Sequence, residues 1–232
     1  MWIECFLGGD GLKIAVWNVE RLKHYKRLDE IERLCARIEA DIFVLTESDS
    51  RLVLDYPYRL HSRRLAEISP DLYRPTENLV SVYSKYPCVR RHTVFDNGSA
   101  LCAELETERG PLLVYGTVMG IFGNRCREFK EVLPKQCADF ARLCAAGLPL
   151  CVCGDFNISF SDNYYFTHWG RNMLRSAFED NGIEVLTEAL PQCIDHIALS
   201  RSFCAGADFT LQQWNGDKAL SDHAGVAVDI RW

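Results

Sequence analysis

The chain has 232 residues, of which 48% are hydrophobic and 25% are charged, and its formal net charge at pH 7 is −6. No apolar run is as long as a membrane-spanning helix, and no internal repeat or Ser/Gly-rich linker divides the chain, so we predict one domain over residues 1–232 without a membrane span. The acidic charge argues against strong sequence-independent attraction to nucleic acid, although it leaves room for a local basic patch.

The first ten residues and the cysteines indicate the cellular compartment of the protein. Residues 1–10 have no basic start and carry an acid at Glu4, so we do not expect a signal peptide. Eleven cysteines is an odd number, and no two form a CxxC pair. Buried free thiols explain this pattern better than disulfides or zinc, so we predict a cytoplasmic protein, which we take to be a monomer.

The chain opens with a β-α-β pattern. Residues 12–17 and 41–45 are apolar runs of strand length, and the spacing of apolar residues between them predicts a helix over 26–39. A right-handed crossover makes these strands parallel neighbours, with their carboxyl ends at one edge of a sheet. Polar residues follow both strands: Asn18 and Glu20 after the first, and Glu47 after the second.

A long polar segment, residues 62–78, comes next and carries Arg63, Arg64 and Arg74. An irregular segment of this length in a compact domain is usually functional or mobile. Two interpretations of the arginines remain open, because they can clamp phosphates or simply be solvated.

The remaining elements complete the fold class. Three strands over 79–84, 99–106 and 111–118 have short connections, which predict antiparallel neighbours. A second helix over 125–145 precedes a strand over 148–153. A short helix over 172–180 is followed by strands at 184–187, 194–200 and 225–230. About ten strands and three helices predict an α/β (α+β) protein with mixed, mostly antiparallel sheets and outer helices.

The stretch from 148 to 157 organises the candidate site. Gly154 permits the backbone to bend, and Asp155 and Asn157 then project from the end of the strand. Gly-Asp-x-Asn alone is ordinary turn composition. However, four other apolar runs end or are interrupted in the same way, at Asn18/Glu20, Glu47, Asp195 and Asp222/His223.

These polar groups suit a particular chemistry. Oxygen ligands with one histidine and no cysteine favour Mg²⁺ or Mn²⁺ over zinc. Glu47, backed by Glu20 or Asn18, is the natural first ligand. Phosphodiester hydrolysis requires neutralised charge, an aligned water and a stabilised leaving oxygen. A metal, the Asp155–Asn157 pair and a histidine oriented by an aspartate, His223 with Asp195, can divide these tasks.

The order of five motifs resembles the endonuclease/exonuclease/phosphatase superfamily, which includes DNase I and exonuclease III-type AP endonucleases. Each motif is weak alone, but the five together are specific, and they span the chain from the first strand to nearly the last residue. They are Asn18-x-Glu20, Glu47, Gly154-Asp155-Phe156-Asn157, Ile194-Asp195-His196-Ile197 and Ser221-Asp222-His223.

This resemblance implies a four-layer α-β-β-α sandwich with the active site at one edge. It implies a Mg²⁺ site at Glu47 and Asn18, with Glu20 and Asp222 near it. By the same resemblance, Asp155 activates the attacking water and Asn157 holds it and the phosphate. His223 and Asp195 then steady the phosphoryl group.

One departure from the family concerns substrate contacts. The family usually has a His or Tyr after the strand that we place at 112–118, and this chain has only Thr117 or Val118 there. Thr117 is the expected substitute, and Asn124, Arg125 or His168 are further candidates from loops. Loss of such a donor lowers a rate by about a hundredfold in other enzymes.

Three further features bear on the site. His196 points away from Asp195 on a strand, which favours a structural role. The aromatic residues of 164–169, Tyr165 among them, can stack on bases or cover the core, and these remain equal alternatives. Arg125 and Arg127 open the second helix, where phosphate contact is reasonable.

Our first hypothesis is a divalent-metal-dependent phosphodiesterase that acts on nucleic acid. The second is a hydrolase of a small or lipid-linked phosphate ester, which the acidic charge makes easier to accept. A third is a non-catalytic binding module, supported only by the missing His or Tyr. A long basic or aromatic groove favours nucleic acid, whereas a closed pocket favours a small substrate.

Overall fold

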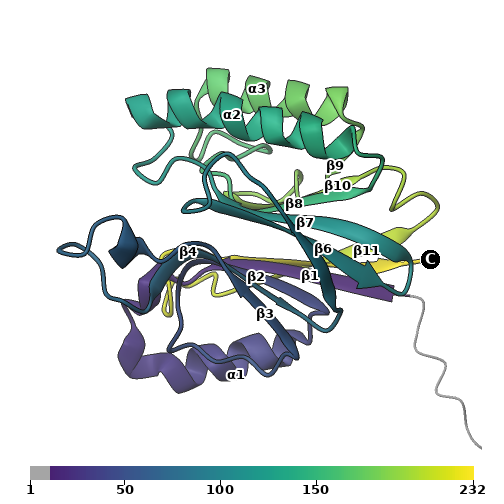
Figure 1. The fold of residues 1–232 in the computed structure, drawn as a ribbon. Coiled ribbons are helices and arrows are strands. Elements are labelled where there is room, and N and C mark those ends of the chain that lie inside the picture. The colour runs from purple at the N-terminus through teal and green to yellow at the C-terminus, as the bar shows by residue number, and fades with distance from the viewer. Residues whose placement is uncertain (1–10) are drawn as a thin grey trace, which may run out of the picture.

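Two six-stranded sheets pack face to face in the computed structural model, which describes residues 11–232 (Figure 1). One helix covers the outer face of the first sheet, and two helices cover the outer face of the second. The predicted four-layer α-β-β-α sandwich is therefore confirmed. The prediction about a signal peptide concerns residues 1–10, which lie outside the described residues.

The first sheet has the strand order β11-β12-β1-β2-β4-β3. Its strands are β1 (Gly11–Asn18), β2 (Ile42–Asp49), β3 (Tyr58–His61), β4 (Glu77–Ser84), β11 (Asp208–Trp214) and β12 (Gly225–Arg231). Helix α1 (Leu28–Ile38) connects β1 to β2, and these two strands are parallel, as the β-α-β pattern predicts. The other pairs in this sheet are antiparallel.

The second sheet has the order β5-β6-β7-β8-β10-β9. Its strands are β5 (Cys88–His92), β6 (Ala100–Thr107), β7 (Gly110–Val118), β8 (Leu150–Asp155), β9 (Ile183–Val185) and β10 (Asp195–Ser200). Helix α2 (Arg127–Cys144) connects β7 to β8, which are the parallel pair of this sheet. Helix α3 (His168–Asp180) lies beside α2 on the same face.

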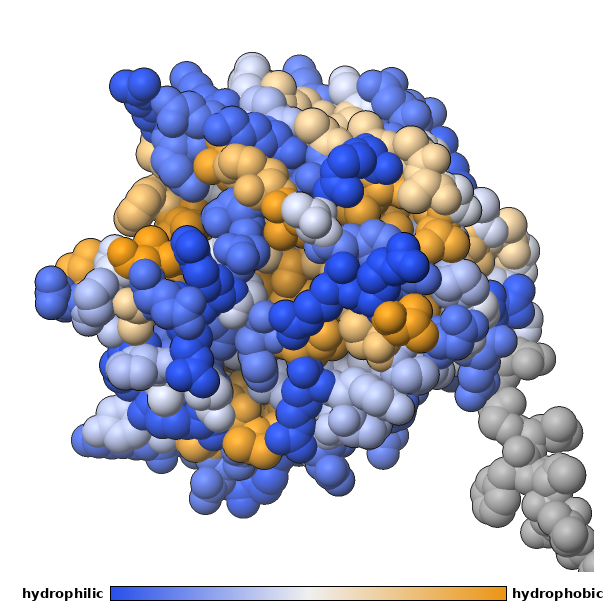
Figure 2. All heavy atoms as spheres, viewed as in Figure 1, coloured by the Kyte–Doolittle hydropathy of each residue, from blue (hydrophilic) through white to orange (hydrophobic). Residues whose placement is uncertain are grey.

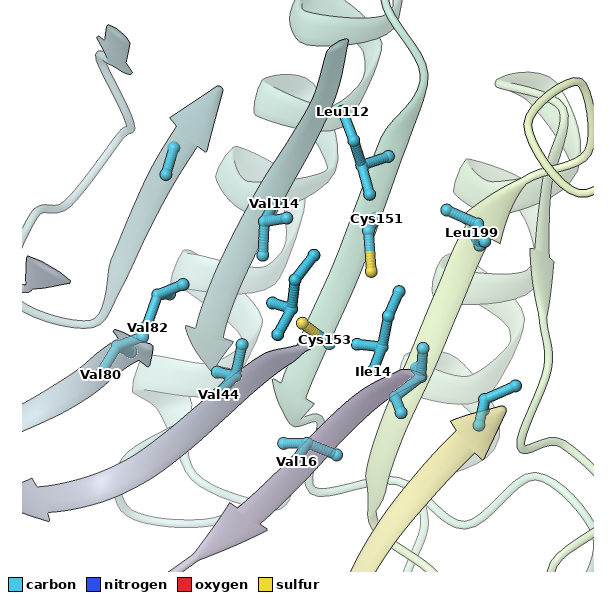
Figure 3. Close-up of a cluster of buried hydrophobic side chains, with 14 of the residues drawn as sticks. Ile14, Val16, Val44, Val80, Val82, Leu112, Val114, Cys151, Cys153 and Leu199 are labelled. Atoms are coloured by element: carbon cyan, nitrogen blue, oxygen red, sulfur yellow. The ribbon is translucent and has the colours of Figure 1, made fainter. Parts of the chain in front are cut away.

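Alternation along the strands divides the core into three layers. Alternate side chains such as Val44, Val114 and Cys151 fill the space between the sheets (Figure 3). Their neighbours in sequence point outward, so that Phe43 packs towards α1 and Tyr115 towards α2. The sheets approach each other closely at Gly116, since a Cβ there would meet the side chains of β4 and β2 at 2.7 and 3.2 Å.

The structure corrects the strand assignments in two ways. The predicted hairpin from 79–84 to 99–106 is wrong, because β4 pairs with β2 and β3 in the first sheet, whereas β6 pairs with β5 and β7 in the second. Three strands were not predicted: β3, β5 and β11. Each is an outermost strand with mostly exposed or half-buried side chains, so its sequence lacks a clear apolar alternation.

The segment predicted as irregular, residues 62–78, contains a short 3-10 turn at Leu65–Glu67 before β4 begins at Glu77. Within residues 11–232, ten cysteines are free, five of them buried. No helix in this described part of the chain is both long and apolar enough to cross a bilayer.

Candidate active site

The polar residues predicted to cluster come together at one edge of the sandwich, on the left in Figure 1. The parallel pair places the carboxyl ends of β1 and β2 side by side, which brings Asn18 next to Glu47. In the other sheet β10 runs antiparallel to β8, so Asp195 at the start of one strand is the register partner of Asp155 at the end of the other.

Asp155 is buried at the end of β8 and faces the space between the sheets. Gly154 is required before it, because a Cβ there would lie 1.9 Å from the carbonyl oxygen of Thr117 on β7. Burial raises the pKa of Asp155 to about 7; the His223 cation opposes this shift and the Asp195 carboxylate adds to it. A carboxylate with such a pKa is well matched to accepting a proton near neutral pH.

Asn157 adopts a left-handed backbone conformation, with φ of 53°, directly beyond Asp155. Its backbone N–H donates to Asp155 Oδ1 at 2.9 Å. Its side-chain amide donates to the carbonyl oxygens of Met119 and Gly120, at 3.1 and 3.2 Å. Asn124 in turn donates to the Asn157 carbonyl oxygen at 2.7 Å, so this residue is held from two sides.

Asn18 and Glu47 form the part of the site contributed by the first sheet. Asn18 Nδ2 donates to Glu47 Oε1 at 3.4 Å and to Asp155 Oδ2 at 3.2 Å, which links the two sheets. Asn18 Oδ1 accepts from the Glu20 N–H at 2.9 Å. Glu47 also has a left-handed backbone, with φ of 43°, and its other oxygen lies 3.7 Å from Arg21 Nε. Both glutamate oxygens therefore have only long contacts.

Asp195 and His223 form an ion pair opposite Asn18. His223 Nδ1 lies 2.6 Å from Asp195 Oδ2, which orients the imidazole. Burial alone would lower the pKa of His223, but the Asp195 and Asp155 carboxylates outweigh burial and raise it to about 10. The ring is therefore protonated at neutral pH, and Nε2–H is left for another acceptor, with Asp222 Oδ1 3.8 Å away.

Three residues that we did not predict hold this histidine in place. Ser221 Oγ donates to the Asn18 carbonyl oxygen at 2.6 Å and accepts from the His223 N–H at 3.2 Å. Asn215 Nδ2 and Trp17 Nε1 both donate to the His223 carbonyl oxygen, at 2.7 and 3.0 Å. Ser221 stands in a motif that the sequence displays, whereas the Asn215 contact depends on the unpredicted strand β11.

Glu20 and Asp222 lie at the rim of the site, where Glu20 is half-buried and Asp222 is exposed. Glu20 forms an ion pair with Lys23 at 2.5 Å and accepts from the Asp222 N–H at 3.4 Å. The Asp222 side chain is 65% exposed. Glu20 also lines a hollow of about 750 Å³ together with Arg21 and Tyr73.

The structure does not place Thr117 at the site. Along β7 the even-numbered residues Leu112, Val114 and Val118 face the space between the sheets, so Thr117 points to the opposite face. Its side chain is fully buried, and its hydroxyl donates to the Ser99 carbonyl oxygen at 3.5 Å. The prediction of a substrate contact by Thr117 is corrected accordingly, and Val118 offers no polar group in its place.

The other residues predicted to contact the substrate lie in three different surroundings. Asn124 is buried against Asn157, where it braces the site and leaves its Oδ1 without a partner. Arg125 is exposed beside it. The hydroxyl of Tyr165 packs against Gly123. His168 is the first residue of α3, is exposed, and contacts the Phe166 ring edge to face.

His196 has the structural role that the strand alternation favours. It is buried, with Nε2 2.9 Å from the Ile158 carbonyl oxygen and Nδ1 2.9 Å from Thr187 Oγ1. Burial lowers the pKa of His196 to about 4, so the folded protein keeps this ring neutral where an unfolded chain protonates it.

Acid should therefore destabilise the protein through His196. Because the unfolded state binds a proton below pH 6.5 and the folded state only below about 4, this residue should remove about 3 kcal/mol of unfolding free energy between those values. Urea unfolding of wild type and His196→Gln at pH 7, 5.5 and 4.5 measures the effect. The variant should lose less stability on acidification than wild type, and equal losses would contradict the expectation.

Comparisons with known proteins bear on the family and the fold. The model of the Endonuclease/Exonuclease/phosphatase family matches residues 15–223. No curated protein matches the chain. The fold is similar to that of the 3′-5′ exonuclease NExo from Neisseria meningitidis, with a TM-score of 0.69, 21% identity and coverage of 95% of this chain and 100% of that chain.

Two further structures are similar to the same extent. The 3′ phosphatase NExo from Neisseria, bound to a product DNA hairpin, has a TM-score of 0.69 and 19% identity, over 95% of this chain and 100% of that one. The endonuclease domain of TRAS1, a telomere-specific non-LTR retrotransposon, has a TM-score of 0.68 and 13% identity, over 95% and 98%. The match over residues 15–223 and the shared fold show that this chain belongs to the endonuclease/exonuclease/phosphatase family.

Proposed function

We propose that the protein is a Mg²⁺- or Mn²⁺-dependent hydrolase of phosphodiester bonds in nucleic acid. The observation that carries this proposal is the buried carboxylate pair of Asp155 and Asp195 with the protonated His223, beside Asn18 and Glu47 at one sheet edge. Family members act on phosphate esters, and this arrangement supplies a proton acceptor and a cation at one place. A non-catalytic binding module has no physical need to keep these groups together.

The residues present suit a hard divalent cation. Both Glu47 oxygens have only long contacts, and the buried Asp195 Oδ1 has no hydrogen-bond partner. Asp155, Asp195 and His223 also place ligand atoms within 4.8 Å of one another. Because His223 Nδ1 is already engaged with Asp195 and the Glu47 oxygens have only long contacts, we place the cation at Glu47, with Asn18, Glu20 and Asp222 around it.

A cation bound there would neutralise phosphate charge and acidify water. The protein groups then divide the remaining work. Asp155 accepts the proton of the attacking water, and its raised pKa suits that step. Asn157 fixes the Asp155 carboxylate through its backbone N–H. His223 donates from Nε2 to a phosphoryl oxygen, while Asp195 holds its other nitrogen.

Nucleic acid is the substrate class that we favour. In the Neisseria structure with the product hairpin, a protein of the same fold holds DNA, which supports this choice. The hollow beside Glu20 opens to solvent rather than forming a closed pocket, which suits an extended substrate. Its charged lining is balanced, with the cations Arg21, Lys23 and Arg74 and the acids Glu20, Asp71 and Glu77. The second candidate is hydrolysis of a small or lipid-linked phosphate ester, and a panel of substrates distinguishes it from nuclease activity.

The free thiols support a reducing, cytoplasmic location, and we retain a monomer as the expected state.

The test uses bis(p-nitrophenyl) phosphate, p-nitrophenyl phosphate and a short single-stranded DNA, each with Mg²⁺, Mn²⁺ or EDTA. We expect cleavage of the diester and the DNA only with metal. Cleavage of the monoester alone would favour the second candidate, and no cleavage of any substrate would overturn both.

Removal of the Glu47 charge should weaken metal binding. Because Glu47→Gln loses the negative oxygen that we assign to the cation, half-activation should require about tenfold more Mn²⁺. Mn²⁺ binding followed by electron paramagnetic resonance gives a readout that is independent of turnover. Glu108→Gln, in the turn at the opposite end of the sandwich, is the matched control and should bind Mn²⁺ as wild type does. Unchanged Mn²⁺ binding by Glu47→Gln would place the cation elsewhere.

A further inference from the structure

Phe122 is an exposed aromatic residue next to the candidate active site. Its side chain is 74% exposed, and only Leu72, at 76%, is more exposed among the large apolar side chains of the described residues. It stands in the loop between β7 and α2. No step of the proposed hydrolysis uses it.

The turn that carries Phe122 directs its side chain into solvent. The Gly123 N–H donates to the Gly120 carbonyl oxygen at 2.8 Å, so Phe122 is the third residue of a four-residue turn. Gly120 and Gly123 have φ of 78° and 88°, which favour glycine. A Cβ at Gly120 would meet the Phe129 ring at 2.4 Å, and the space beside Gly123 is filled by Tyr165. The turn therefore rests on packed aromatic rings.

The same turn is attached to the catalytic edge. Asn157 Nδ2 donates to the Gly120 carbonyl oxygen at 3.2 Å, and Asn124 donates back to the Asn157 carbonyl oxygen at 2.7 Å. Asn157 is bonded in turn to the Asp155 carboxylate. Phe122 is thus held at a fixed place relative to the carboxylate that we assign as proton acceptor.

The surroundings of Phe122 favour a flat, partly polar ligand over a lipid surface. The neighbouring exposed side chains on its C-terminal side are Arg125 and Arg127; Arg127 forms an ion pair with Glu131 at 2.6 Å, which leaves Arg125 as the neighbouring cation. On the face shown in Figure 2, apolar atoms lie in small groups between hydrophilic ones rather than in one continuous patch. A nucleotide presents a flat base close to its phosphate, and base–aromatic stacking requires no basic protein, which suits the charge of −6.

We propose that Phe122 is a stacking platform for the nucleobase adjacent to the scissile phosphate. This inference rests on the proposed nuclease function and adds the recognition of an unpaired base. Stacking contributes about 1–3 kcal/mol per base, so its loss should lower kcat/KM by about 5- to 150-fold.

The test first maps the cleaved bond in a short single-stranded DNA. Wild type, Phe122→Ala and Phe122→Trp are then compared on that strand and on strands with an abasic residue on either side of the bond. Phe209→Ala, an exposed phenylalanine on β11, is the matched control and should behave as wild type. We expect Phe122→Ala to lose at least fivefold in kcat/KM on the intact strand and to match wild type on one abasic strand, with Phe122→Trp restoring the rate.

Direct stacking is measured with 2-aminopurine next to the cleaved bond. In the inactive Asp155→Asn background, binding should quench its fluorescence, and Phe122→Ala should abolish the quenching. Equal losses on intact and abasic strands, or unchanged quenching, would overturn the stacking proposal while leaving nuclease activity in place. Vesicle binding that depends on Phe122 would also overturn it. Absence of all DNA cleavage would instead refute the proposed function.

Discussion

Replacing Asp155 by asparagine is expected to lower kcat by about 10³-fold, within the range that general base catalysis contributes. The reason is specific to this carboxylate. It is buried, and its pKa is raised to about 7. Its Oδ1 accepts from the Asn157 N–H and its Oδ2 accepts from Asn18 Nδ2 at 3.2 Å, which leaves a second lone pair on Oδ2 for a water. An asparagine oxygen can still accept the Asn157 hydrogen bond, but it cannot take up the proton of the attacking water. Turnover of bis(p-nitrophenyl) phosphate measures the effect.

The variant should fold, because the substitution removes one of two neighbouring buried acids and keeps the shape of the side chain, although it loses one of the hydrogen bonds that the carboxylate accepts from the Asn157 N–H and Asn18 Nδ2. Thermal unfolding checks this. Asp208→Asn, at the far end of β11, is the matched control and should retain wild-type turnover. A loss of less than tenfold in Asp155→Asn, with normal unfolding, would mean that another group accepts the proton.

The sheet order could be predicted only in part. The β-α-β unit was predictable because α1 and its two strands have clear periodicity over continuous sequence. The division of strands between sheets was not. β4 and β6 are separated by the short strand β5, whose exposed arginines give no apolar alternation, so the sequence resembles a direct hairpin. The pairing of β11 with β12 was not predicted either, because the side chains of β11 are mostly exposed and its sequence lacks a clear apolar alternation.

The site was predictable where strand ends determine it. Asn18, Glu47, Asp155 and Asp195 lie at strand ends that the topology must bring to one edge, so the order of the motifs was sufficient to predict that they converge, while their roles remain a proposal. Thr117 was misplaced because its face depends on the register of β7, and a shift by one residue reverses a side chain. The turn that carries Phe122 was not predicted, since its exposure follows from packing of Phe129 and Tyr165 around two glycines.

Replacing His223 by glutamine is expected to lower kcat by about 10²- to 10³-fold, the range that the loss of one preorganised electrostatic contact to developing charge costs. The structure makes this histidine a cation, because the carboxylates of Asp195 and Asp155 raise its pKa to about 10. Glutamine retains an N–H donor but loses the positive charge. The measurement is single-turnover cleavage of the short single-stranded DNA at saturating enzyme, which separates the chemical step from binding.

The role of Asp195 determines whether the rate losses of the Asp195 and His223 variants add in the double variant. If Asp195 acts only by orienting His223 through the 2.6 Å contact, Asp195→Asn should cost less than His223→Gln, and the double variant should cost no more than His223→Gln alone. Additive losses would mean that the unpartnered Asp195 Oδ1 contacts the substrate, the metal or the attacking water itself. Because both side chains are largely buried, thermal unfolding of each variant must accompany the kinetics. If the rate losses are additive and the variants fold normally, Asp195 is a catalytic residue rather than a positioning residue.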